Sequence, residues 1–178
     1  MDFETTQKAI DNYQPTHPED AQFRTELLDF IARYPEDFHR RTTLEGHLTA
    51  SAWIVNATRD RFLLTHHAKL QRWLQLGGHI EDDATLVDAA LREAREESGL
   101  FTVRLVKPAI FDLDIHTIPA RKGEPEHLHL DVRFLLEADD QEPLSLTEES
   151  HALAWVSADT IRKEHPDASM LRMLSKTH

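Results

Sequence analysis

Residues 77–100 read GGHIEDDATLVDAALREAREESGL, and this stretch decides the fold because it joins two glycines and a run of acids to one amphipathic helix. At about 100° per residue, the apolar side chains of the helix fall on a single stripe, formed by Val87, Ala90, Leu91 and Ala94. Glu93, Glu96 and Glu97 cluster about 120° away from that stripe. The pattern predicts a helix that packs on one side and presents carboxylates beside the packed face.

The sequence also marks the ends of this helix. We expect it to span residues 83–98, with an aspartate as the N-cap residue and Gly99 in the left-handed conformation that ends many helices. Gly77 and Gly78 precede it, and a glycine turn brings backbone groups close to a ligand because no side chain intervenes. The turn is therefore expected to face the carboxylates.

The three glutamates predict a cation site. Like charges this close resist simultaneous ionisation unless something positive lies among them, and Arg92 and Arg95 offset only part of the charge. Oxygen ligands favour Mg²⁺ or Mn²⁺, ions that neutralise phosphate oxygens and activate water. The residues alone thus predict metal-assisted phosphoryl hydrolysis.

The same stretch resembles the Nudix box, whose pattern is G-x5-E-x7-R-E-U-x-E-E-x-G-U with U an aliphatic residue. Counted from Gly78, the second half of the pattern, residues 92–100, matches almost throughout. The first half departs from it, because Ala84 replaces the first glutamate and Asp83 replaces the glycine before it. Either Asp82 or Asp83 would restore the missing acid.

The resemblance implies an α/β fold, an α/β/α sandwich around a mixed β-sheet. It also implies an enzyme that uses Mg²⁺ or Mn²⁺ to cleave the pyrophosphate bond of a small nucleoside diphosphate derivative, such as a nucleotide sugar, a dinucleotide or a nucleoside triphosphate. Its metal ligands, carried over by position, are Gly78 through its carbonyl, Glu93, Glu96 and Glu97. Glu96, Glu97 and Arg92 form the implied catalytic set, in which Arg92 orients the carboxylates.

Other residues are candidates for proton transfer or substrate binding. The base that activates water is either a box glutamate or an acid of a distant loop, where Glu148 and Glu149 are the candidates and an exposed acidic turn is the alternative. His79 follows the glycine pair, and Lys69 and Arg72 precede it, so all three are candidate phosphate contacts. Solvated loop positions are the alternative interpretation.

The chain is expected to divide into a helical N-terminal extension, residues 1–45, and a Nudix domain, residues 46–178. The extension looks helical to about residue 40, with an interruption at residues 14–20, where two prolines occur. Its stripe of Phe23, Leu27 and Ile31 packs on the domain or, alternatively, makes a homodimer contact. The domain alternates predicted strands with turns: strands at 47–56, 61–67, 109–118, 127–138 and 151–157, followed by two short helices.

Two of these strands, 109–118 and 127–138, form a predicted hairpin with a face rich in histidine and aspartate. The polar residues alternate along both strands: Asp112, Asp114 and His116 on one, His127, His129 and Asp131 on the other. They either contact a substrate phosphate or a second metal, or form a solvent-facing surface. Trp53 and Trp73 are expected to pack, with stacking on a base as the alternative.

Composition limits the partners. The chain has 178 residues, a net charge of −12 and no cysteine, so DNA and long RNA are unexpected partners and any metal must use oxygen or imidazole ligands. Without an apolar run that could span a bilayer or a signal peptide, we expect a cytoplasmic protein. Two rival hypotheses are a Nudix fold that binds nucleotide without hydrolysis and an acidic cation-binding domain without phosphate chemistry.

Overall fold

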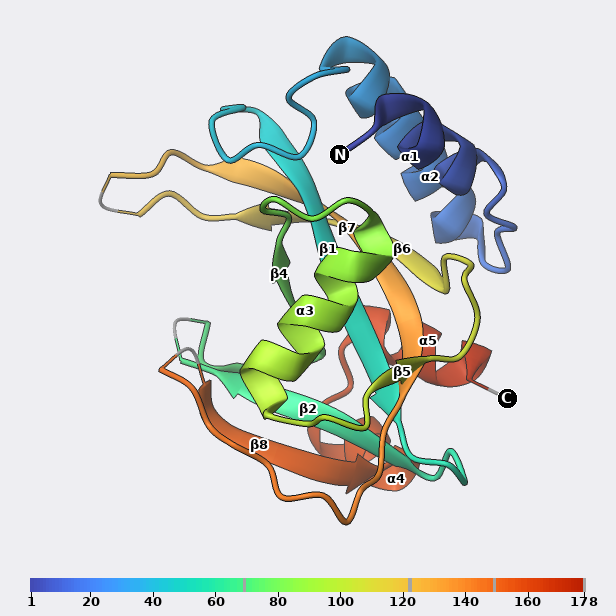
Figure 1. Cartoon of the computed structure of the whole chain (residues 1–178), viewed down its shortest axis with the longest axis vertical. Helices are drawn as coiled ribbons and strands as arrows, with labels where there is room; N and C mark the ends of the chain where they lie inside the picture. Colours follow the sequence, from blue (N-terminus) through green and yellow to red (C-terminus); the bar gives the residue numbers. More distant parts are fainter. Residues whose placement is uncertain (69, 122, 149, 178) are drawn as a thin grey trace.

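The computed structural model describes residues 1–177 except 69, 122 and 149, and over these residues eight strands form one mixed sheet (Figure 1). The strands are β1 (Gly46–Val55), β2 (Arg61–His67), β3 (Arg72–Leu74), β4 (Leu76–His79), β5 (Arg104–Leu105), β6 (Asp112–Ile118), β7 (His127–Glu137) and β8 (Ser150–Ser157). The helices are α1 (Phe3–Asp11), α2 (Pro18–Arg33), α3 (Leu86–Ser98), α4 (Ala158–Glu164) and α5 (Ala168–Lys176).

Strand β1 organises the sheet. It runs parallel to β7 along its whole length, and on its other edge it pairs antiparallel with β4 and then with β2. Strand β7 also pairs antiparallel with β6, so the predicted hairpin is confirmed, with His116 opposite His129 and Asp114 opposite Asp131. Every residue of β1 is buried, which is expected for a strand covered on both faces.

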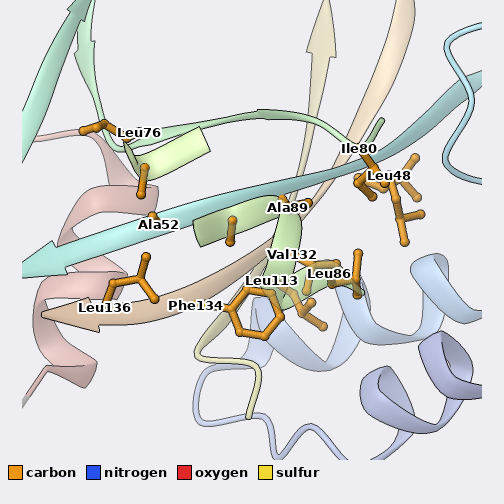
Figure 2. Packing of buried hydrophobic residues seen from close by; sticks show 14 of the residues in the cluster. Leu48, Ala52, Leu76, Ile80, Leu86, Ala89, Leu113, Val132, Phe134 and Leu136 are labelled. Atoms are coloured by element: carbon orange, nitrogen blue, oxygen red, sulfur yellow. The ribbon is translucent and has the colours of Figure 1, made fainter. Parts of the chain in front are cut away.

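Helices cover both faces of the sheet, which confirms the predicted α/β/α sandwich. Helix α3 lies in front of β1 in Figure 1, and α4 and α5 lie behind it. On the α3 face, which α1 and α2 also cover, alternate residues of β1 from Leu48 to Ile54 pack with Ala89, Ala90 and other apolar side chains (Figure 2). On the opposite face Trp53 packs with apolar residues of α4 and α5.

Helix α3 begins later than the sequence predicts. Thr85 is the N-cap residue: its side chain accepts a hydrogen bond from the Asp88 amide, and Asp88 bonds back to the Thr85 amide. The expected aspartate cap at residue 83 is wrong because Asp83 bonds Arg92 instead. The other end is confirmed, since Gly99 has φ 73°.

The N-terminal segment contains two helices, separated at the predicted prolines, and Pro18 occupies the first turn of α2. Residues 34–40 form a bend and turns rather than the expected helix. Leu27 and Ile31 are fully buried in the core shared with the sheet, so the apolar stripe packs within the chain.

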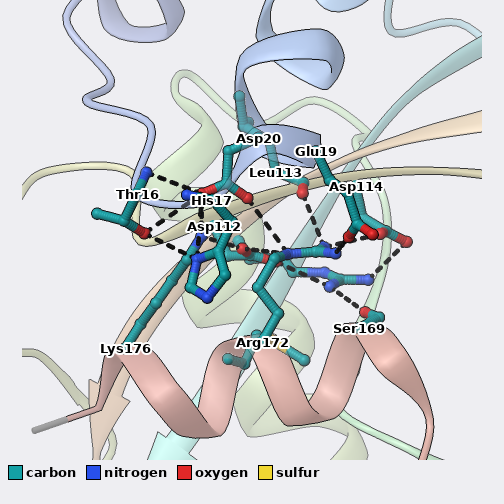
Figure 3. Close-up of polar contacts among 12 residues, drawn as sticks. Thr16, His17, Glu19, Asp20, Asp112, Leu113, Asp114, Ser169, Arg172 and Lys176 are labelled. Carbon is teal, nitrogen blue, oxygen red and sulfur yellow. Dashed lines mark hydrogen bonds and ion pairs between the residues drawn. The ribbon is translucent and has the colours of Figure 1, made fainter.

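A network of buried charges fastens α2 to β6 and α5 (Figure 3). Asp20 of α2, which is 0% exposed, accepts a 2.7 Å hydrogen bond from Lys176, and Lys176 also bonds Asp112. Arg172 bonds Asp112 and Asp114 and lies 3.3 Å from Asp20. Burial favours a raised pKa for the Asp20 carboxyl, but hydrogen bonds from Lys176 and two backbone amides leave this pKa below its ordinary value.

Candidate active site and metal centre

Helix α3 holds Glu93 and Glu97 against the glycine pair of β4. Glu97 is 5% exposed, and its Oε2 accepts a 3.0 Å hydrogen bond from the amide of Gly77. The Glu93 carboxylate lies over Gly78, where an added Cβ would come within 2.8 Å of all three of its carboxyl atoms. Gly77 has φ 148°, and an added Cβ would clash with Ser51. Both glycines are therefore required for the close approach of the strand and the helix.

Arg92 contacts three carboxylates of this acidic site. Its guanidinium donates to Asp83 at 2.8 Å, to Glu93 at 2.9 Å and to Glu96 at 3.0 Å. It also donates to the backbone oxygen of His79 at 2.9 Å, which ties the helix to the loop. The hydrogen bond with Asp83 is the largest cause of a raised Arg92 pKa, so the guanidinium stays charged.

Asp83, one residue before Ala84, is paired with Arg92. Its carboxylate receives hydrogen bonds from both the Nε and an Nη atom of Arg92, and these bonds lower its pKa. Asp82 and Ala84 are exposed. Of the two acids considered from the sequence, the structure thus brings Asp83 onto Arg92.

The remaining acids differ in accessibility. The Glu96 side chain is 61% exposed and contacts Arg92, so it lies at the rim of the site. Glu148 is exposed in a turn before β8, and Glu149 lies outside the described residues.

A cavity of about 610 Å³ connects the glycine pair to the polar face of the sheet. Gly77, Gly78 and His79 line one side of it, and the other lining residues include Ser51, His47, His116, His127, His129 and Asp131. His79 therefore faces the cavity, as a substrate contact would. Arg72 is not among the lining residues, and its guanidinium bonds Asp167 at 2.6 Å.

The polar face of β6 and β7 is covered rather than open to solvent. Asp112, Asp114 and Asp131 are buried and all three accept hydrogen bonds from Arg133, which is 2% exposed. Burial opposes the charge of Arg133, but the three carboxylates hold its pKa above the ordinary value. The aspartates therefore serve the interior, and the histidines beyond them face the cavity.

Five histidines converge at this end of the cavity. The rings of His47 and His129 lie 4.9 Å apart, and those of His79, His116 and His127 lie within 5.5 Å of one of these two. Burial, followed by the neighbouring histidines, lowers the pKa of His47 and of His129 to about 3, so both rings are neutral near pH 7. His47 was missed as a site residue because the parallel register that places it opposite His129 is absent from the local pattern.

The two candidate tryptophans, Trp53 and Trp73, contact neighbouring side chains. Trp53 is buried, and its indole nitrogen donates a 3.0 Å hydrogen bond to the Thr177 hydroxyl, so packing is the correct interpretation. The Trp73 ring packs near His66 and His165. Lys69 lies outside the described residues.

Comparison with known proteins assigns the class of this site. The NUDIX domain model matches residues 46–174, which is most of the chain. The chain belongs to the Nudix family, and the resemblance recognised from the box is confirmed.

Relatives and solved structures agree with the family. A probable DHNTP pyrophosphohydrolase of Lactococcus lactis is 34% identical over 108 residues, which cover 60% of this chain and 64% of the relative. The chain thus spans somewhat less than two thirds of that protein. A NUDIX-family hydrolase from Clostridium perfringens has a TM-score of 0.54 at 27% identity, covering 74% of this chain and 95% of its own. A C. elegans Ap4A hydrolase complex shares the fold, with a TM-score of 0.57 at 19% identity, covering 72% and 93%.

The helices were also checked for membrane segments. Within the part of the chain that the structure describes, none is long and apolar enough to cross a bilayer.

Proposed function

We propose that this chain is a divalent-cation-dependent hydrolase that cleaves the pyrophosphate bond of a small nucleoside diphosphate derivative. The observation that carries the proposal is the placement of Glu93 and Glu97 against Gly77 and Gly78, two glycines that also line a cavity with the volume of a small-molecule site. Family membership and a relative named as a pyrophosphohydrolase support the same class of enzyme.

The donor set fits a hard cation. Asp83, Glu93, Glu96 and Glu97 bring four carboxylates to a site whose central cation is the Arg92 guanidinium. An ion such as Mg²⁺ or Mn²⁺ would balance the remaining negative charge, with Glu93, Glu96, Glu97 and the Gly78 carbonyl as its proposed ligands. When bound, such an ion supplies charge neutralisation at phosphate oxygens and a more acidic water.

The residues of the chain have separate proposed roles. The Gly77 amide fixes the Glu97 carboxylate by a hydrogen bond, and Arg92 fixes Glu93 and Glu96 in the same way. Glu96 and Glu97 are our candidates for accepting the proton of the attacking water, with Glu148 as the alternative outside the box. His79, which lines the cavity, is positioned to contact a substrate phosphate. Arg72 stays a prediction as a substrate contact, and its guanidinium is paired with Asp167.

We also propose a substrate class, a cellular location and a limit on any homodimer contact. The substrate is a free nucleotide derivative rather than nucleic acid, because the chain carries a net charge of −12. We place the protein in the cytoplasm. A homodimer would have to use a surface other than the stripe of Leu27 and Ile31, because these residues are buried within the chain.

The test is turnover of a panel of nucleotide sugars, dinucleoside polyphosphates, nucleoside triphosphates and a pterin triphosphate, each with Mg²⁺ and with Mn²⁺. We expect cation-dependent cleavage of at least one member. Glu97→Gln should lower kcat by at least about 100-fold, because the amide retains the hydrogen bond from Gly77 but removes the charge. Glu148→Gln is the comparison variant outside the box. A loss of kcat larger than that of Glu97→Gln would assign Glu148 as the base.

Two results would overturn the proposal. If no member of the panel is cleaved with either cation but a nucleotide binds tightly, the chain is a nucleotide-binding Nudix protein. If calorimetry detects cation binding that no nucleotide alters, and no turnover occurs, the acidic cation-binding hypothesis replaces it.

A further inference from the structure

The histidine cluster contains a set of three imidazoles with the spacing of a metal site. His47 of β1 and His129 of β7 are direct partners across the parallel pair, and His127 lies two residues before His129 on the same face. One ring nitrogen from each of the three lies within 4.8 Å of the others. The three rings therefore point at a shared volume, and all three line the cavity.

Hydrogen bonds determine which nitrogens are available. The Nδ1 atom of His127 lies 2.9 Å from the backbone oxygen of Pro125, and because a carbonyl only accepts, Nδ1 must carry the proton. The lone pair of His127 is then on Nε2. A hydrogen bond from the other ring nitrogen to a carbonyl orients metal-binding histidines in many proteins.

The other two rings have buried nitrogen atoms without hydrogen-bond partners. His47 is 2% exposed, and neither of its ring nitrogens has a hydrogen-bond partner. The Nε2 atom of His129 is likewise buried without one. A buried polar atom without a partner costs free energy, and a ligand between the two rings would satisfy one nitrogen on each.

We propose that His47, His127 and His129 bind a transition-metal cation of the Zn²⁺ type, at a site separate from the carboxylates of α3. Imidazole nitrogen suits Zn²⁺, Co²⁺, Ni²⁺ and Cu²⁺, whereas Mg²⁺ requires oxygen ligands. Zn–N bonds of about 2.0–2.1 Å place the nitrogens of a tetrahedral site about 3.4 Å apart, so small ring rotations complete the site. The cavity leaves room for a fourth ligand.

An anion is the competing ligand, and the surroundings disfavour it. An anion would require ring N–H groups that point at it. For His127 this means a protonated ring, because the one N–H of its neutral form already faces the Pro125 carbonyl. The ring of His127 lies 5.2 Å from that of His47, which is buried, so placing a positive charge in this cluster is costly. Neutral rings that offer lone pairs match a cation instead.

This site does not depend on pyrophosphate hydrolysis, so it is tested by metal binding alone. The first measurement is Co²⁺ and Zn²⁺ binding in excess Mg²⁺, by equilibrium dialysis with metal analysis and by the visible absorption of bound Co²⁺. We expect about one ion per chain for the wild type and for the Glu93→Gln/Glu97→Gln double variant. His127→Gln and His129→Gln should each bind at least tenfold more weakly, and His151→Gln, an exposed histidine outside the cluster, should bind as the wild type does.

A second measurement needs no histidine variant and therefore survives a folding defect. Cu²⁺ bound to the Glu93→Gln/Glu97→Gln protein should show nitrogen hyperfine structure in its electron paramagnetic resonance spectrum. Binding that disappears in this double variant, or a spectrum without nitrogen coupling, would overturn the proposal. So would orthophosphate binding that depends on His127 and His129 in the absence of any tight metal, because the cluster would then be an anion site.

Discussion

At the scale of single residues, Asp83 supplies a carboxylate near the position where the box has lost its first glutamate. Ala84 removes the expected glutamate, but the carboxylate one residue earlier reaches the same guanidinium. The loop before α3 brings Asp83 to Arg92, and the helix is capped by Thr85 instead. Arg92 therefore has a carboxylate partner in Asp83, although Asp83 lies one residue before the position of the first glutamate in the box.

We therefore expect Asp83→Asn to lower kcat by roughly tenfold, because Arg92 would lose its strongest partner and hold Glu93 and Glu96 less rigidly. Steady-state turnover of whichever nucleotide the panel identifies measures this. Asp82→Asn is the matched control, since Asp82 is exposed. Equal activity of the two variants would show that Asp83 has no positioning role.

At the scale of elements, local patterns predicted much of what the structure contains. The hairpin of β6 and β7 and the C-terminal end of α3 follow from alternation and from Gly99, which act within a few residues. The histidine cluster depends on the pairing of β1 with β7, strands far apart in sequence. No local pattern carries that information, so His47 was not predicted.

The capping box of α3 makes a prediction at this scale. Thr85→Ala removes the hydroxyl that accepts from the Asp88 amide, and should lower the free energy of unfolding by about 1 kcal/mol. Denaturant unfolding at pH 7 measures the change. Thr25→Ala, at an exposed position inside α2, should stay within about 0.5 kcal/mol of the wild type, and an equal loss there would argue against a capping effect.

At the scale of the whole molecule, the buried charges make the attachment of α2 depend on pH. The pKa values of the Asp20 and Asp114 carboxyls lie below their ordinary values in the folded state. The unfolded chain therefore binds more protons as the pH falls through about 4, so the stabilisation present at neutral pH is lost below that value.

Asp20→Asn tests this dependence. At pH 7 the variant should be less stable by about 3 kcal/mol, because Lys176 keeps a buried charge and loses one of its two carboxylates. The difference should shrink as the pH falls below about 4, because the Asp20 carboxyl is then protonated in the unfolded chain while the folded protein still holds it ionised. Denaturant unfolding at a series of pH values measures both, and a difference independent of pH would contradict the ionic origin.

The bond between Asp20 and Lys176 also has a consequence for synthesis on the ribosome. The two residues are 156 positions apart, so α2 leaves the exit tunnel long before the helix that neutralises its buried aspartate. During that interval burial of Asp20 would leave its charge without Lys176 and Arg172. We infer that α2 docks late, after the sheet has formed around β1, and that until then its apolar face is open to chaperones.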